Sequence, residues 1–220
     1  MFLQTVASLL APQQNACHLC GALLGRGEAT LCDDCRRELS RCRVSPEEAT
    51  YADCSPLTAP LAAFWYEGAA RELVLQLKFG HDRFAALPLA DGLCAAYLDR
   101  PEGTPRPDVT IPIPAHLSRL RARGYNQAEE LARAFCAQTN LPFAPDGLRR
   151  LHHNTSQISR GRKERLSAMA GAFQASRSFA GMRVLLVDDV FTTGATAISC
   201  GETLLLAGAS QVDLLVCCMA

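Results

Sequence analysis

The sequence predicts an α/β protein, a parallel sheet flanked by helices, with a small cysteine-bearing module at its amino-terminal end. The sheet is indicated by apolar runs at 184–187 and 211–218, which show no polar alternation and are typical of strands buried on both faces. The module is indicated by two C-x-x-C turns within residues 17–35. A chain of 220 residues is long enough for one ordinary domain with such an appendage.

Composition limits the kinds of partner. The 22 Lys and Arg balance the 22 Asp and Glu, so the net charge gives no global attraction to nucleic acids or membranes. The charge is uneven, since residues 115–165 hold ten Lys and Arg against four Asp and Glu. No apolar run approaches the roughly 20 residues of a membrane span. Residues 1–11 lack the basic start of a secretory signal and are expected to form a short helix, so we expect a cytoplasmic protein.

The C-x-x-C turns predict a metal site. Its four cysteines are Cys17, Cys20, Cys32 and Cys35. Two such turns supply four thiolates to one tetrahedral Zn²⁺, and disulfides are the alternative that this paired spacing disfavours. The zinc would be structural, because a segment of about 40 residues cannot bury enough surface to fold unaided. Cys42 and Cys54 have no C-x-x-C partner, and the sequence leaves open whether either joins the site.

A polar linker follows at 44–60, so we divide the chain into a zinc module with its linker (1–58) and a main domain (59–220). The next elements expected are a strand at 63–66, a helix at 71–79, an amphipathic helix at 85–98 and a proline-marked loop at 101–107. Lys78 ends the first of these helices. It is either placed to reach an anionic ligand or is a surface lysine near a helix C-terminus.

Residues 108–114 form a strand that ends in alternating prolines and therefore cannot be a fully paired central strand. The turn after it carries three arginines, and a helix then runs to about residue 138. Arginines on a loop at the carboxyl end of a strand suit a pyrophosphate, a solvated basic turn being the alternative. We favour Arg119 and Arg123, since alternate residues share a side of an extended turn. The basic segment 149–165 is expected to be an exposed loop.

The strand at 184–187 is expected to end at Asp188 and Asp189, with a turn and then a helix over 195–207. Ligands of open α/β sheets sit beyond the carboxyl ends of the strands, where a helix start offers free N–H groups to a phosphate. The expected cradle comprises Thr192, Thr193, Gly194, Ala195 and Thr196. The two carboxylates can accept hydrogen bonds from vicinal sugar hydroxyls, so the stretch predicts a ribose 5-phosphate site. A polar turn with a good N-cap is the alternative.

The stretch 187–196 resembles the phosphoribosyl pyrophosphate (PRPP) motif of type I phosphoribosyltransferases, in the version of the ComF family. The Leu-Lys-Phe at 77–79 and the Arg-Leu-Arg-x-Arg-Gly-Tyr-Asn-Gln block at 119–127 are similar to further blocks of that family. The resemblance implies a type I phosphoribosyltransferase-like fold that binds PRPP with Mg²⁺ and transfers the phosphoribosyl group to an unidentified nitrogenous acceptor. Its implied contacts are Asp188 and Asp189 on the ribose hydroxyls, 192–196 on the 5-phosphate, and Arg119, Arg123 and Lys78 on the pyrophosphate.

The resemblance implies two further features. A flexible loop near 149–165 would close over the reacting centre; Gln157, Glu164 and Arg165 match the family pattern, whereas Asn154 and Ala168 depart from it. ComF proteins are also associated with natural competence, in which single-stranded DNA is handled with a helicase-like partner and a DNA-loading protein. The alternative function is therefore a single-stranded-DNA adaptor in which PRPP binding is regulatory or vestigial.

Overall fold

The computed structural model describes residues 16–45, 54–58, 60–151 and 171–220. Its centre is a four-stranded sheet in the order β1-β6-β5-β2, in which every neighbouring pair is parallel. The strands are β1 (Leu61–Trp65), β2 (Val109–Pro112), β5 (Arg183–Phe191) and β6 (Gln211–Met219). The fold class expected from the two apolar runs, a parallel sheet flanked by helices, is confirmed.

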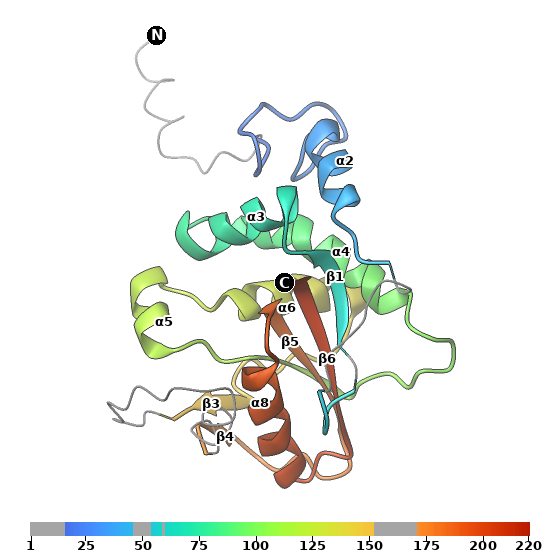
Figure 1. Cartoon of the computed structure of the whole chain (residues 1–220), viewed down its shortest axis with the longest axis vertical. Helices are drawn as coiled ribbons and strands as arrows, with labels where there is room; N and C mark the ends of the chain where they lie inside the picture. The colour runs from blue at the N-terminus through green and yellow to red at the C-terminus, as the bar shows by residue number, and fades with distance from the viewer. Residues whose placement is uncertain (1–15, 46–53, 59, 152–170) are drawn as a thin grey trace.

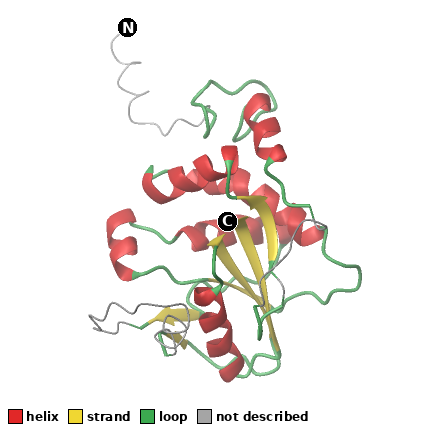
Figure 2. Ribbon diagram, viewed as in Figure 1, coloured by secondary structure: helices red, strands yellow, loops and turns green. Residues whose placement is uncertain are grey.

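Helices cover both faces of this sheet (Figures 1 and 2). One face packs against α4 (Ala86–Leu98) and α6 (Gln127–Thr139), with α3 (Gly68–Phe79) contacting β1 and a 3₁₀ turn, η1 (Arg83–Ala85), leading into α4. The opposite face packs against α8 (Ala195–Leu206). Each face therefore has its own hydrophobic core.

Strand β5 divides its side chains between these two cores. Leu185 and Val187 belong to the cluster under α3, α4 and α6, whereas Val184 and Leu186 belong to the cluster under α8. All four are at most 2% exposed. Successive side chains of a strand point to opposite faces, so a run buried on both faces must be apolar at every position. This explains why the sequence lacks alternation here.

Short segments from elsewhere in the chain cover both edges of the sheet. At the β1 edge, Arg43 forms an antiparallel bridge with Phe64, and the Trp65 N–H donates to the Cys42 carbonyl at 2.7 Å. At the β2 edge, Thr110 bridges to Phe143. The proline-ended strand β2 therefore lies at an edge, as its sequence requires, and each outer strand has an irregular neighbour.

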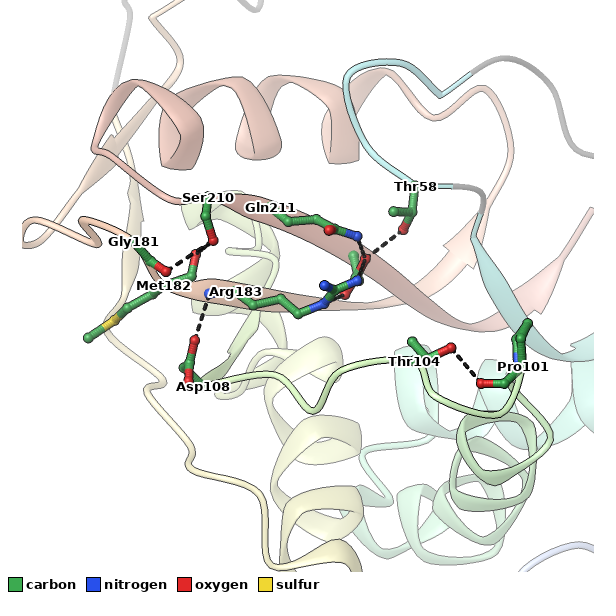
Figure 3. A network of polar contacts seen from close by, with 10 residues as sticks. Thr58, Pro101, Thr104, Asp108, Gly181, Met182, Arg183, Ser210 and Gln211 are labelled. Atoms are coloured by element: carbon green, nitrogen blue, oxygen red, sulfur yellow. Dashed lines mark hydrogen bonds and ion pairs between the residues drawn. The ribbon is translucent and has the colours of Figure 1, made fainter.

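A polar network ties the amino ends of the strands together (Figure 3). The Arg183 Nε donates to Asp213 Oδ2 at 2.7 Å, and Thr58 and Gln211 donate to the other oxygen of Asp213. The Arg183 N–H donates to Asp108 Oδ2 at 2.8 Å, which connects β5 to the start of β2. These contacts fix the register at the end of the sheet that is remote from the expected phosphate site.

Three expectations about local structure are wrong. The arginine-bearing segment is a helix, α5 (Leu117–Arg123), rather than an extended turn. Strand β5 continues past Asp188 and Asp189 to Phe191, because it stays paired with β6 as far as Met219. The start of the expected basic loop pairs as an antiparallel hairpin, β3 (Leu148–Arg150) with β4 (Phe173–Ala175). The helix expected at 1–11 and loop residues 152–165 lie outside the described residues.

Candidate functional site

The two adjacent carboxylates lie at the carboxyl end of β5, on opposite faces of the sheet. Asp189 continues the face of Val187, and its Oδ2 lies 3.1 Å from the Nζ of Lys78 on α3. Asp188 continues the face of Leu186 and interacts electrostatically with the Cys200 thiol of α8. The pair thus forms the rim of the sheet, with one carboxylate already neutralised by a lysine.

Asp188 is the most strongly perturbed acid of the site. Burial, and next the charge of Asp189, raise the pKa of its carboxyl to about 8, although the Asp189 N–H donates to Asp188 Oδ1 and Lys78 lies nearby. Desolvation and a neighbouring like charge both disfavour the ionised form. Near neutral pH the Asp188 carboxyl therefore keeps its proton in a large fraction of molecules, and a cationic group arriving in the site would favour its ionisation.

Lys78 is held at the rim by the ends of two helices. It lies in the last turn of α3, and both it and Asp189 have side chains that are only 17% exposed. The buried Tyr125 hydroxyl, just before α6, donates to the Leu77 carbonyl at 2.8 Å and fixes this end of α3. The lysine is thus a partner of a site carboxylate rather than a free surface charge.

The turn after β5 presents a helix start to the same rim. Gly194 is the N-cap of α8 with φ 72°, a left-handed conformation that favours glycine. A Cβ at this position would lie 3.0 Å from the Phe191 ring, so the close packing of the turn also requires glycine. The Thr192 side chain is exposed and Thr196 is partly exposed. Free N–H groups in the first turn of α8 can bind a phosphate oxygen.

Helix α5, which carries the arginines expected to bind pyrophosphate, has seven residues and buries none of its side chains. His116 caps it by accepting the Ser118 N–H, and Gly124 ends it with φ 81°. Arg119 and Arg123 are four residues apart and share one face of this helix. They are therefore neighbours because of helical spacing. The sequence analysis expected them to be neighbours because alternate residues of an extended turn share a side.

A cavity of about 440 Å³ opens where these elements meet. Of the expected site residues, it is lined by Lys78, Arg119, Asp188, Asp189, Thr192 and Thr196. Arg123 does not line it; this arginine lies over the Phe79 ring in an adjoining cavity of about 610 Å³, and the two cavities share Tyr66, Lys78 and Arg119. Thr193, Gly194 and Ala195 also do not line the first cavity.

Several lining residues were missed from the sequence. They are Tyr66, His116, Asn126, Gln127 and Arg150. Asn126 has a structural task as well, because its side chain caps α6 and donates to the Ile113 carbonyl at 3.0 Å. Asn126 and Gln127 end the same sequence block that contains the arginines, and this proximity could have indicated that they lie at the site. Arg150 falls in the segment 149–165, which the sequence predicts to be an exposed loop.

The four cysteines of the C-x-x-C turns form one cluster, whose Sγ atoms lie within 4.8 Å of one another. Four thiolates about 2.3 Å from one zinc would lie about 3.8 Å apart in a tetrahedron. The Sγ atoms of Cys20 and Cys32 are 3.8 Å apart, and the described residues, which include all 11 cysteines, contain no disulfide. The donor set and its spacing are therefore compatible with one structural zinc.

The cluster packs against the main domain. Against the effect of burial, backbone hydrogen bonds from Cys20, Cys32 and Leu19 lower the pKa of the Cys17 thiol to about 6. The first helix among the described residues, α2 (Asp33–Arg41), begins inside the cluster and places Leu39 in the core beneath α3. His18 does not join the metal cluster; its Nδ1 lies 2.8 Å from Asp82 Oδ2 of the main domain.

The remaining cysteines lie outside the metal cluster found among the described residues. Cys42 is buried against the Glu38 and Glu67 carbonyls, and Cys54 is buried in the core under α8. Cys136, Cys200, Cys217 and Cys218 are buried, and Cys94 is half-buried. All seven are packing positions. For Cys42 and Cys54 the sequence had left open whether they join the zinc site.

Curated proteins named competence protein or DNA utilization protein resemble this chain. Competence protein F of Haemophilus influenzae is 30% identical over 147 residues, which is 64% of this chain and 64% of that protein. DNA utilization protein YhgH of Salmonella typhi is 29% identical over 66% of this chain and 65% of its own length. The chain thus spans just under two thirds of these two relatives. Competence protein ComFC of Bacillus subtilis is 27% identical over 86% of this chain and 77% of that protein.

Solved structures give weaker likenesses. The structure of glutamine PRPP amidotransferase from B. subtilis aligns with 66% of this chain and with 30% of its own chain, at 19% identity and a TM-score of 0.45. The structure of adenine phosphoribosyltransferase from Leishmania tarentolae aligns with 59% of this chain and with 54% of its own chain, at 19% identity and a TM-score of 0.36. No family model matches the chain. Among the described residues, no helix has the length and apolar character needed to span a membrane.

Proposed function

We propose that this chain, which resembles competence protein F and competence protein ComFC, binds PRPP or ribose 5-phosphate with Mg²⁺ in the 440 Å³ cavity. The observation that carries the proposal is the meeting of two carboxylates, a helix start and basic side chains around one cavity. Carboxylates that accept from vicinal hydroxyls, next to N–H groups that bind a phosphate, match the two ends of a phosphorylated ribose.

Each part of the cavity has a role in this proposal. Asp188 and Asp189 accept hydrogen bonds from the ribose 2- and 3-hydroxyls, and the turn at 192–196 binds the 5-phosphate. Arg119 and Lys78 bind the pyrophosphate from one side, with Arg123 reaching it from the adjoining cavity. Mg²⁺, bound with the ligand, would neutralise charge on the pyrophosphate; carboxylate and hydroxyl oxygens are ligands that suit it.

The reaction that this arrangement supports is phosphoribosyl transfer. The C1–oxygen bond to pyrophosphate breaks, a bond from C1 to the acceptor nitrogen forms, and the acceptor proton passes to solvent. The protein would act mainly by orienting the ribose and by stabilising the charge on the leaving pyrophosphate. The acceptor is not identified by the described residues. The cysteine cluster would hold one zinc with a structural role.

Calorimetric titration with PRPP, with and without Mg²⁺, tests the binding proposal. We expect magnesium-dependent binding that is lost in an Asp188→Asn, Asp189→Asn double variant. The chain offers a matched control in its second adjacent pair, Asp33 and Asp34, both exposed on α2. Asp33→Asn, Asp34→Asn should bind like the wild type. Absence of binding to the zinc-loaded wild type contradicts the proposal.

The second candidate is a single-stranded-DNA adaptor that acts with other competence proteins, and the adjoining 610 Å³ cavity favours it. Phe79 is 66% exposed there, and the Arg123 guanidinium lies 5.0 Å from the centre of its ring. Exposed aromatic rings beside cations are typical of surfaces that stack bases and track a phosphate backbone. The relatives' names, competence protein and DNA utilization protein, point to the same class of ligand.

Fluorescence anisotropy with a labelled oligothymidine at several salt concentrations tests the adaptor. Salt-sensitive binding that Phe79→Ala weakens, and that PRPP leaves unchanged, would support it. Leu206→Ala is the control, since Leu206 is 90% exposed at the end of α8 and lines neither cavity. No binding at low salt would eliminate this candidate.

A further inference from the structure

Arg150 enters the cavity from the β3–β4 hairpin, an element that the sequence did not predict. Side chains two residues apart in a strand share a face, so Arg150 points the same way as Leu148. Leu148 is 3% exposed and belongs to the core under α8, whereas Arg149 between them is exposed. The hairpin, which packs beside α8 through β4 (Figure 1), therefore turns Arg150 inwards and Arg149 outwards.

Arg150 has no ion-pair partner among the described residues. Among the described residues, neither Arg150 nor Arg119 has a carboxylate within ion-pair distance, and Lys78 is already paired with Asp189. Burial lowers the pKa of the Arg150 guanidinium, and the nearby charge of Arg119 lowers it further, against an opposing effect of Cys200. Two arginines that repel each other across one cavity leave a place for an anion.

Packing alone explains only part of this position. The Arg150 guanidinium lies 5.3 Å from the centre of the Phe173 ring, its neighbour across the hairpin, and this contact uses one face of the plane. The N–H groups at the edge of a guanidinium need acceptors of their own. A surface arginine would satisfy them with water, but Arg150 is partly buried beside the cavity.

We propose that Arg150 is a ligand-binding residue, which together with Arg119 holds one phosphate-type anion in the 440 Å³ cavity. This inference rests on the proposed function for the identity of the whole ligand, but its anion site can be tested separately. In this proposal the hairpin contributes a ligand-binding side chain to the cavity, in addition to those contributed by α5 and by the start of α8. It also favours a ligand with more than one anionic group, since the first turn of α8 offers a separate phosphate site.

Calorimetric titrations with inorganic pyrophosphate and with ribose 5-phosphate test the assignment and identify which anion Arg150 holds. We expect Arg150→Ala to lose about tenfold to a hundredfold in affinity for at least one of the two, as is usual when a charged hydrogen-bond donor is removed. Arg149→Ala is the matched control, one residue away on the opposite face, and should stay within about twofold of wild type. Arg150→Lys, which keeps the charge but not the planar fork, should be intermediate.

The outcomes separate this inference from the proposed function. Unchanged affinity of Arg150→Ala for both probes, with an unchanged melting temperature, overturns the inference, as does a wild type that binds neither probe. If wild type binds PRPP and Arg150→Ala binds it equally well, the inference fails and the proposed function stands. If wild type binds pyrophosphate through Arg150 but binds neither PRPP nor ribose 5-phosphate, the proposed function fails and the anion site stands.

Discussion

The cavity at the carboxyl edge of the sheet and the cysteine cluster are built on opposite principles. The cavity is bordered by Asp188 and Asp189 at the end of a strand whose four preceding residues are at most 2% exposed, so its side chains are held by a packed core. The cluster sits in residues 16–42, where few apolar side chains are buried. The first site is organised before any ligand arrives, whereas we expect the second to need its metal.

Removing the metal should give the largest effect and is the strongest test of this contrast. Because Leu31, Cys35 and Leu39 of the module pack into the core beneath α3, loss of zinc should destabilise the whole chain. We expect Cys35→Ser, or chelation, to lower stability by at least about 3 kcal/mol, roughly 10 °C in melting temperature. Differential scanning fluorimetry with metal analysis measures this.

Cys94→Ser is the matched control, since Cys94 is half-buried on α4 and outside the cluster. It should leave the zinc content at one per chain and lower the melting temperature far less than Cys35→Ser. Purified protein that contains no zinc, or a melting temperature that chelators do not change, would show that the cluster is held by packing and would remove the contrast.

A smaller effect is expected when the cavity is deformed without removing a charge. Gly194→Ala forces a side chain into a left-handed position, which costs about 1 kcal/mol, and sets its Cβ 3.0 Å from the Phe191 ring. We expect a further loss of about 1 kcal/mol from that contact and at least a tenfold loss of PRPP affinity. Chemical denaturation and calorimetry measure the two.

Gly103→Ala separates backbone strain from cavity shape. Gly103 also has a left-handed φ, of 80°, but an added Cβ would meet no atom within 4 Å. It should show the strain of about 1 kcal/mol and bind PRPP like the wild type. Equal affinities for both variants would mean that the turn before α8 does not shape the ligand site.

A change of similar size is expected in the pH dependence of stability. Burial and the charge of Asp189 raise the pKa of Asp188 to about 8 in the folded chain, against a usual value of 3.8. Between these values the folded state holds a proton that the unfolded state has released. The protonated carboxyl therefore favours folding fully below about pH 4, and this advantage is lost as pH rises towards 8.

Asp188→Asn should abolish that slope, because the amide does not titrate. We expect the free energy of unfolding of the wild type, relative to the variant, to fall by up to about 2 kcal/mol between pH 6 and 8, since one proton contributes at most about 1.4 kcal/mol per pH unit. Urea denaturation at a series of pH values gives this difference. Parallel pH profiles would mean that Asp188 is ionised and solvated, like a surface carboxylate.

The same contrast between packed and unpacked regions explains what the sequence could predict. Strands β5 and β6, with helices α6 and α8, have continuous or periodic apolar residues because each is buried against a core. The helix α5 buries no side chain, so no apolar pattern distinguishes it from a turn. Strand β3 has three residues, too few to show a period of two, and its pairing with β4 joins segments separated in the chain.

Site prediction failed where the fold brings separate elements together. The cradle at 192–196 and both carboxylates could be proposed from the sequence because the motif is contiguous. The pairing of Lys78 with Asp189 joins α3 to β5, and the inward turn of Arg150 depends on the register of the hairpin. Charge and residue type alone describe Arg149 and Arg150 equally well. Only the strand geometry distinguishes them.

The cover on the outer strand β1 has a consequence for the fate of metal-free protein. The segment that pairs with it, Cys42 to Val44, directly follows the helix that begins in the cysteine cluster. Unfolding of the cluster would release this segment and leave the backbone N–H and carbonyl groups of β1 unpaired. An exposed edge strand is a template for the strands of other chains. Zinc loss would then convert a folded chain into a seed for aggregation.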